Sequence, residues 1–377
     1  IPFPNHNQMP RNSYQSGMYD QALGTFNLVH WTRMPTSYKL LTDPTRAKAE
    51  TNLSEISGLN NNCSGQMVLT AYLTLPENQE DAITANEDFN GFEGYKYVCS
   101  FLTRKIKSEI VEKFERPLDE FNQGKYSHME ENGFPIYGTY VSQGMPLIGK
   151  IGFNKATKET INMSLYVNVG EHGYVDGVWR TINADNEEQV TVRLKKKIRI
   201  EVGSKYSSRH AQKGVAGPKL SRRNSPYFYG GKNHRTVPEF FISAFGQPSR
   251  MTIGKIIEGF KSKCAIRLNS VENASAFIDH DFDYYSAVLV NEGLDSHGSE
   301  KMRHPNGKML KTEVFAFPCY YQALRQTVDG KTQVRGTGLL SPFSRQPTKG
   351  RKKKGSNRQG EMERDANCSM GASSKLL

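Results

Sequence analysis

Two adjacent carboxylates, Glu80 and Asp81, are the first residues along the chain whose types suggest chemistry. They follow residues 68–75, a largely apolar run that ends at Pro76 and predicts a buried strand. Paired acids at the end of a strand could face a metal-bound nucleotide, directly or through water. The alternative is the N-terminus of a helix, where the helix dipole favours acidic side chains. From the residues alone, the helix N-terminus is the preferred interpretation.

Basic residues gather farther along the chain. Between Arg193 and Arg223 the sequence has eleven lysines and arginines and a single acid, Glu201. Small residues flank Arg209 and Lys213 in this stretch, so the backbone there could approach a ligand closely. Arginine binds phosphate through two N–H groups, and lysine acts as a point charge. The stretch predicts a loop that binds a polyanion, and the alternative is a solvated basic hairpin.

A second basic cluster occupies residues 349–358, which contain six basic residues and no acid. It precedes Glu361 and Glu363 at the start of an expected helix over residues 361–377, and a helix dipole favours acids at that end. The cluster could hold a nucleic-acid backbone. The alternative is a disordered basic linker.

The acidic triplet Asp279, Asp281 and Asp283 resembles a hard-cation site because its carboxylates alternate along the chain. The alternative is an acidic turn between a helix near Ile253 and a strand over residues 287–291. A nuclease built on the triplet would need a supporting constellation of His or Glu side chains, and the sequence does not suggest one. We therefore prefer the acidic turn.

The composition favours a nucleic-acid partner. The chain has 377 residues, a formal charge of +12 and a pI near 9.3, and such an excess of positive charge attracts polyanions. Mean hydropathy is −0.63 and no long apolar run occurs, so no membrane span is expected. The five cysteines include no CxxC pair, which argues against a structural zinc site and suggests a reducing compartment. Because the first residue is Ile1, we expect a piece of a longer product.

Short β-type runs dominate the middle of the chain. We expect strands over residues 161–169, 174–182 and 190–200, with the last two paired as a hairpin. Residues 106–114 are compatible with either a helix or a strand.

Two helices are expected toward the C-terminal half. Apolar residues recur at i, i+3, i+4 and i+7 from Ile253 to Phe260, which predicts an amphipathic helix. Residues 320–328 predict a short helix. The mixture of short strands and few helices indicates an α+β fold.

Six segments, in this order along one chain, resemble the second-largest (β-type) subunit of multisubunit DNA-dependent RNA polymerases. They include NQEDAITAN, GSKYSSRHAQKG and PSRMTIGKIIE, and their details are closer to archaeal and eukaryotic members than to bacterial ones. The six segments are residues 1–24, 78–86, 203–214, 248–258, 320–331 and 344–365.

The resemblance implies roles in nucleotidyl transfer for residues at matching positions. Arg11 and Arg250 match arginines near the triphosphate of the incoming nucleotide. Glu80 and Asp81 match an acidic pair that supports the second Mg²⁺ of a two-metal site. The first Mg²⁺ would be held by an aspartate triad of the largest (β′-type) subunit. No metal is expected to be held tightly by this chain, and no zinc.

The resemblance also implies contacts with the RNA–DNA hybrid. Lys197 and Lys205 match lysines near the RNA 3′ end and the active centre, and Gln8 and Gln21 match glutamines that line the hybrid. The GRKKKG loop over residues 350–355 matches a segment that contacts the hybrid. Together with the basic residues noted above, the candidate nucleic-acid-binding residues are Gln8, Gln21, Arg209, Lys213, Arg351 and Lys352.

The sequence departs from the family pattern at several positions. Pro76 and Glu77 stand where Gly-Tyr is usual, Ala211 replaces a glycine, and Gln326 occupies a position usually held by histidine. The zinc-binding clamp that usually follows GEMERD is absent from the sequence. These departures suggest a divergent lineage, such as that of a large DNA virus.

From the resemblance we expect a multi-domain α+β fragment. Residues 1–95 and 192–355 would form a discontinuous hybrid-binding domain, residues 96–191 an inserted β-rich wall or flap, and residues 356–377 the start of an anchor segment. The partners implied are the largest and other polymerase subunits, template DNA, RNA and nucleoside triphosphates, without a membrane. The implied location is intracellular: the nucleus for a cellular eukaryote, the cytoplasm or virion for a virus. The alternative is a non-catalytic nucleic-acid-binding protein derived from such a subunit.

Overall fold

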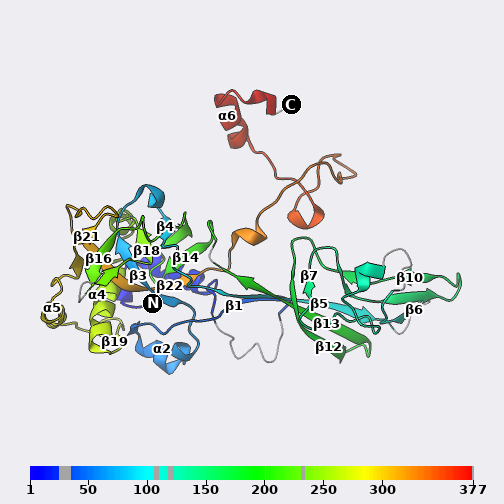
Figure 1. The fold of residues 1–377 in the computed structure, drawn as a ribbon, viewed down its shortest axis with the longest axis horizontal. Coiled ribbons are helices and arrows are strands. Elements are labelled where there is room, and N and C mark those ends of the chain that lie inside the picture. Colours follow the sequence, from blue (N-terminus) through cyan, green and yellow to red (C-terminus); the bar gives the residue numbers. More distant parts are fainter. Residues whose placement is uncertain (25–34, 106–109, 118–122, 200, 231–233, 376–377) are drawn as a thin grey trace.

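A closed six-stranded barrel lies at one end of the molecule (Figure 1). The computed structural model describes all residues except 25–34, 106–109, 118–122, 200, 231–233 and 376–377. The strands follow the order β14-β15-β4-β18-β3-β22, and β22 pairs back with β14, so the sheet closes. They are β3 (Gln66–Tyr72), β4 (Ala82–Ala85), β14 (Lys205–Ser208), β15 (Lys213–Ala216), β18 (Phe240–Ile242) and β22 (Val314–Ala323).

Aromatic side chains fill the barrel. Phe240, Phe317 and Tyr321 are almost completely buried, and Phe240 packs edge-on against Tyr321 with ring centroids 5.2 Å apart. Burying this apolar surface is the main force that closes the sheet. Helix α4 (Ile253–Leu268) packs on β22 at Gly259, where a Cβ would collide with the Phe317 ring. The glycine therefore permits the close approach of helix and strand.

A five-stranded antiparallel sheet extends from the barrel toward the other end of the molecule (Figure 1). Its order is β1-β5-β13-β12-β7, and the predicted hairpin is confirmed as β12 and β13. The strands are β1 (Ser37–Leu41), β5 (Gly94–Arg104), β7 (Tyr140–Val141), β12 (Gly173–Ile182) and β13 (Glu188–Ile198). A separate core of Leu147, Ile148, Val190 and Val192 holds this region together.

Small sheets complete the β-rich part. The strand predicted over residues 161–169 is two shorter strands, β10 and β11, which pair with different neighbours. The residues 110–114 of the ambiguous run include a strand, β6, whereas 106–109 lie outside the described residues. These strands are β6 (Ile110–Lys113), β8 (Pro146–Ile148), β9 (Ile151–Asn154), β10 (Thr160–Asn162) and β11 (Leu165–Tyr166). The remaining short strands are β2 (Ala49–Glu50), β16 (Tyr227–Gly230), β17 (His234–Thr236), β19 (Glu272–Asn273), β20 (Ser299–Glu300) and β21 (Met302–Arg303).

The helices differ from expectation in several places. The helix at Ile253 is confirmed as α4, but the predicted helix over 320–328 is wrong because β22 continues to Ala323, with Tyr320 and Tyr321 buried against the barrel. The strand expected over 287–291 is wrong as well, since those residues belong to a helix, α5. The other helices are α1 (Met9–Tyr19), α2 (Asn52–Ile56), α3 (Gly246–Arg250), α5 (Phe282–Asn291) and α6 (Glu361–Ser369). In the described part of the chain, no helix is long and apolar enough to cross a membrane.

The acidic triplet has a structural role. Asp281 is the N-cap of α5, and its carboxylate accepts a hydrogen bond of 3.0 Å from the Tyr284 N–H. An N-cap of this kind satisfies one of the free N–H groups at a helix start. Among the described residues, no group of three or more potential protein ligands surrounds a metal site. The geometry therefore supports the capping role.

Candidate active site

A tight turn presents Glu80 and Asp81 at the rim of the barrel. It begins with a 3₁₀ turn, η4 (Pro76–Asn78), and Glu80 adopts a left-handed conformation with φ of 53° before β4 starts. The buried Asn78 fixes the turn, because its side chain accepts from the Leu75 N–H at 2.7 Å and donates to the Leu73 carbonyl at 2.8 Å. Both carboxylates are exposed. The preferred reading as an α-helix N-terminus is wrong, since a strand follows the acids.

Arg250 reaches this turn from a distant part of the sequence. It ends α3, where Met251 adopts a positive φ of 49° and turns the chain into α4. The Arg250 guanidinium forms an ion pair with the Asp81 carboxylate. The two side chains are partly exposed, so the ion pair itself adds little stability, and both groups can exchange partners.

A cavity of about 240 Å³ opens beside this ion pair. Arg11 of α1 reaches it with Nη1 3.5 Å from the Ala211 carbonyl, and Lys213 of β15 is exposed there. The cavity is lined by Arg11, Tyr14, Met18, Asp81, Ala211, Lys213 and Arg250. Three cations from three separate segments thus meet around one acid.

Helix α1 is held in place by buried amide groups. The Gln15 side chain donates to Gln322 Oε1 at 2.9 Å and accepts from the Ala211 N–H at 3.0 Å. The Gln8 N–H donates to the Met251 carbonyl at 3.3 Å, beside Arg250. The N-cap and the middle of the helix are therefore tied to the turns that contain Met251 and Ala211.

Arg209 lies differently from the other basic candidates. Its guanidinium donates to Glu258 Oε1 at 2.6 Å and to the Ala49 carbonyl at 2.9 Å, and the side chain is 15% exposed. His210 Nε2 contacts the second Glu258 oxygen at 2.6 Å. The segment from 205 to 216 is a hairpin of β14 and β15 whose turn is anchored to α4, and not a free solvated loop.

The charges of this buried cluster are set by their surroundings. Burial raises the pKa of Glu258, but Arg209 and His210 outweigh it and hold that pKa at about 2. Burial lowers the pKa of His210, so its imidazole is neutral near pH 7. A neutral imidazole that donates from Nε2 accepts at Nδ1, where the Asn7 amide lies at 2.9 Å. Glu258 is therefore a carboxylate that neutralises Arg209.

Lys205 and Gln21 belong to a second cluster. Lys205 Nζ donates to Gln326 Oε1 at 3.3 Å, and Gln326 Nε2 donates to Gln21 Oε1 at 3.4 Å. Lys331 Nζ lies 3.1 Å from the same Gln326 oxygen. Gln326, which stands where the family usually has histidine, thus brings Lys205 and Lys331 together.

Lys197 and the 350–355 loop lie apart from the cavity. Lys197 is on β13, and its ammonium is 2.6 Å from Glu93, which lowers the pKa of that carboxyl through their hydrogen bond. Arg351, in the 3₁₀ turn η8 (Arg351–Lys353), lies so close to Gly170 that a Cβ there would be 2.5 Å from its guanidinium. The Lys352 side chain lies outside the described residues.

A buried network that the sequence pattern does not predict lies beneath Arg250. Lys255 is 1% exposed and donates to Gln212 Oε1 at 2.6 Å and to the Tyr321 hydroxyl at 3.1 Å. Gln212 in turn donates to Gln247 Oε1 at 2.6 Å. The sequence does contain a sign of this network, because Lys255 interrupts the apolar pattern of α4. Helical periodicity, however, assigns such a lysine to the solvent face.

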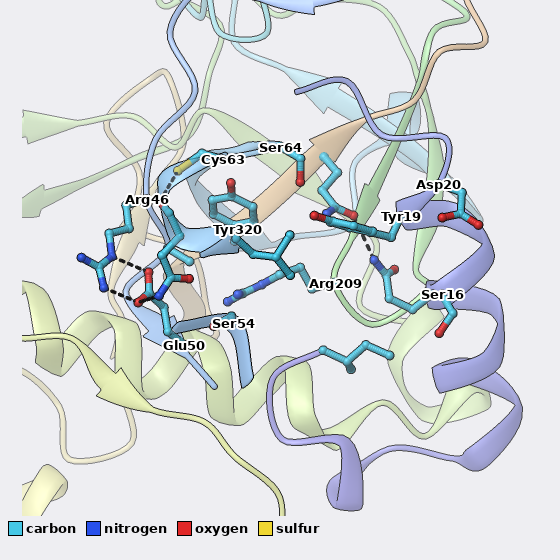
Figure 2. A pocket seen from close by; sticks show the side chains of 16 residues that line it. Ser16, Tyr19, Asp20, Arg46, Glu50, Ser54, Cys63, Ser64, Arg209 and Tyr320 are labelled. Atoms are coloured by element: carbon cyan, nitrogen blue, oxygen red, sulfur yellow. Dashed lines mark hydrogen bonds and ion pairs between the residues drawn. The ribbon is translucent and has the colours of Figure 1, made fainter. Parts of the chain in front are cut away.

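A larger cavity, of about 400 Å³, lies on the other side of α1 (Figure 2). Tyr19 and Asp20 line it from α1, and Arg209 stacks on Tyr320 with 4.9 Å between guanidinium carbon and ring centroid. Arg46 and Glu50 form a two-fold hydrogen-bonded ion pair at its edge. Arg46 and Arg209 are each paired with a carboxylate of their own, whereas the smaller cavity is lined by three cations and one acid, so we place the candidate site in the smaller cavity.

Three cations beside one acid at the rim of a barrel are able to bind an anionic group. The chain belongs to the RNA polymerase Rpb2 family, because residues 1–353 match the family model described as RNA polymerase Rpb2, domain 6. It is 34% identical to DNA-directed RNA polymerase II subunit RPB2 of Schizosaccharomyces pombe and 31% identical to DNA-directed RNA polymerase subunit Rpo2 of Saccharolobus solfataricus. It is 29% identical to DNA-directed RNA polymerase III subunit RPC2 of Saccharomyces cerevisiae.

Each of these alignments covers the whole chain but only 32%, 35% and 34% of the respective relatives. The chain thus spans about a third of the length of the relatives it matches. The resemblance to part of a β-type second-largest subunit is confirmed, and with it the relation to transcription by DNA-directed RNA polymerases.

Proposed function

We propose that the chain supplies part of the active centre of a DNA-directed RNA polymerase and binds the triphosphate of the incoming nucleotide. The observation that carries this proposal is the convergence of Arg11, Lys213 and Arg250 with Asp81 on one cavity. A triphosphate is a dense polyanion, and arginines bind its oxygens through paired N–H groups. The largest polymerase subunit, template DNA and RNA are the partners that this role requires.

Charge neutralisation is the chemistry that these side chains offer. Transfer of a nucleotidyl group to an RNA 3′-OH depends on in-line positioning and on stabilising negative charge, more than on covalent help from the protein. Arg250 is paired with Asp81 in the chain alone, and we propose that it turns to the triphosphate when the nucleotide binds. That exchange frees the Asp81 carboxylate.

Glu80 and Asp81 are suited to help bind a Mg²⁺ ion, but not to hold it without other protein ligands. Glu80 and Asp81 offer exposed carboxylate oxygens, the ligand type that Mg²⁺ prefers, and two carboxylates with substrate phosphates suit its habit of keeping several waters. A bound Mg²⁺ would stabilise charge on the phosphates. The remaining protein ligands would come from the largest subunit.

The second cluster fits the nucleic acid. Lys205, Gln21 and Gln326 form one hydrogen-bonded surface on which we propose that the RNA end of the hybrid lies. Lys197 and Arg351 would contact the backbone farther away. Arg209 is better explained as the anchor of the 209–212 turn, because Glu258 already neutralises it.

Arg250→Ala in the polymerase reconstituted with its largest subunit tests the proposal. We expect the KM for nucleoside triphosphates to rise at least about tenfold, since a desolvated arginine–phosphate contact contributes roughly 1.5–3 kcal/mol. Arg222→Ala is the matched control, because Arg222 also pairs with an exposed acid, Asp88, but lines no part of the cavity. Unaltered elongation at limiting nucleotide in Arg250→Ala would overturn the proposal.

The departures at Ala211 and Gln326 favour a second candidate, a non-catalytic nucleic-acid-binding protein descended from such a subunit. It predicts salt-sensitive binding to an RNA–DNA hybrid without a copurifying largest subunit. Purification from the native source separates the candidates, because a stoichiometric partner carrying an aspartate triad would exclude the second.

A further inference from the structure

Lys255 is a buried cation directly beneath the candidate triphosphate site. Its side chain lines a small cavity whose rim includes Glu80, Asp81, Lys213 and Arg250. The partners of its ammonium are uncharged oxygens, Gln212 Oε1 at 2.6 Å and the Tyr321 hydroxyl. A buried ammonium is costly unless it is hydrogen-bonded or compensated by a nearby charge.

A second buried lysine on the same helix provides a contrast. Lys261 is also 1% exposed, but it has a carboxylate nearby, Glu272, with Nζ and Oε2 3.9 Å apart. It also contacts Tyr285 and His280, away from the barrel rim. Helix α4 thus holds one lysine beside an acid, and one lysine whose hydrogen-bond partners are uncharged and which lies beneath a cavity lined by Lys213 and Arg250 together with Glu80 and Asp81.

We propose that Lys255 is a positioning residue for the triphosphate site, which it shapes by holding Gln212 and by adding a fixed positive charge beneath the bound phosphates. This inference rests on the proposed function. Gln212 is the residue before Lys213, and it is also bonded to Gln247 of α3, the helix that ends at Arg250. One ammonium therefore ties together the two segments that carry Lys213 and Arg250.

The charge of Lys255 depends on pH in the neutral range. Burial lowers its pKa to about 8, so the ammonium is charged below that pH and loses its proton as the pH rises through it. Burial raises the pKa values of Tyr72, Tyr321 and Cys319, which stay neutral, whereas Glu258 stays ionised. Arg250 stays charged, and burial keeps His210 neutral. Among these named groups, Lys255 is the one whose charge changes between about pH 7 and 9.

The test measures the KM and kcat of the reconstituted polymerase for nucleoside triphosphates from pH 7 to pH 9. In the wild type we expect the KM to rise across this range. Lys255→Met should raise the KM about tenfold at pH 7, equivalent to ~1.4 kcal/mol, and remove its pH dependence. Lys255→Arg should keep a low KM with a flat profile, because arginine does not titrate there. Lys261→Met is the control and should keep the wild-type profile.

The outcomes separate this inference from the proposed function. A wild-type pH profile in Lys255→Met or Lys255→Arg would refute the inference, and so would an equal loss of pH dependence in Lys261→Met. If Lys255→Met does not assemble, Lys255→Arg carries the test alone. If Arg250→Ala raises the KM but Lys255→Arg keeps the wild-type pH profile, the proposed function stands and only the role of Lys255 is removed.

Discussion

At the scale of single residues, the carboxylate of Glu258 organises the turn beside the site. It is completely buried and accepts hydrogen bonds from Arg209 and His210, both at 2.6 Å. Removing one partner of a buried ion pair leaves the other charge without compensation, which is far more costly than losing an exposed pair. Glu258 thereby keeps the 209–212 turn, and Lys213 after it, in place.

Glu258→Gln should destabilise the chain by roughly 3–5 kcal/mol, because Arg209 would stay buried without a counter-charge. Urea unfolding measures this change, with Glu115→Gln as control, since the Glu115 ion pair with Lys113 is exposed and should cost at most about 1 kcal/mol. The pKa of Glu258 falls from 4.5 to about 2 on folding, so its stabilisation is present above pH 4.5 and is lost as pH falls toward 2. The free energy of unfolding of Glu258→Gln should therefore fall less steeply than that of the wild type between pH 4.5 and about 2. Equal losses in the two variants would contradict the role of Glu258.

The residues that line the candidate site are easier to predict from the sequence than the role of each one. Arg11, Asp81, Lys213 and Arg250 were named, and they meet in one cavity. Arg209 was given a phosphate-binding role because nothing in the sequence reveals that Glu258, 49 positions away, neutralises it. At position 211 the glycine that is usual in the family indicates a left-handed backbone conformation, which glycine adopts most readily. Ala211 does adopt this conformation, with a φ of 56°.

At the scale of elements, periodicity identified α4 but not its buried face. Ile253 is exposed, whereas Lys255, Glu258 and Lys261 are buried. A hydrophobic pattern assigns charged residues to solvent, and it cannot anticipate partners supplied by the 209–212 turn, β22, β19 and α5. The same limitation explains the error at 320–328, where a run of buried aromatic residues is a strand of the barrel.

Gly259→Ala should destabilise the chain by about 1–3 kcal/mol, because the added Cβ would collide with the Phe317 ring where α4 packs on β22. In an exposed helix the same change ordinarily stabilises, since alanine has the higher helix propensity. Gly17→Ala in α1 is the matched control: a Cβ at Gly17 meets no atom within 4 Å, and the change should stabilise by roughly 0.5–1 kcal/mol. Thermal unfolding of both variants tests the packing, and a stabilising Gly259→Ala would contradict it.

At the scale of the whole molecule, closing the barrel is what assembles the site. Strands β3 and β4 lie in sequence between β1 and the other four strands of the five-stranded sheet, and β14, β15, β18 and β22 follow that sheet. Asp81 and Arg250 are 169 positions apart and meet only because those strands share one sheet. Hydrophobic pattern and turn signals do not specify such long-range pairing, so the sequence predicted the hairpin of β12 and β13 but not the barrel. The family resemblance supplied the expectation that distant segments meet.

The most direct test of the triphosphate site is covalent labelling in a stalled elongation complex. A nucleoside triphosphate that carries an amine-reactive group on its γ-phosphate should label Lys213, which lines the cavity. Lys219, exposed on the segment that follows the same hairpin, should remain unlabelled. We predict that peptide mapping finds the label on Lys213 and that excess cognate nucleotide, but not a non-cognate one, prevents it. Labelling confined to Lys219 or to the lysines of residues 349–354 would contradict the account.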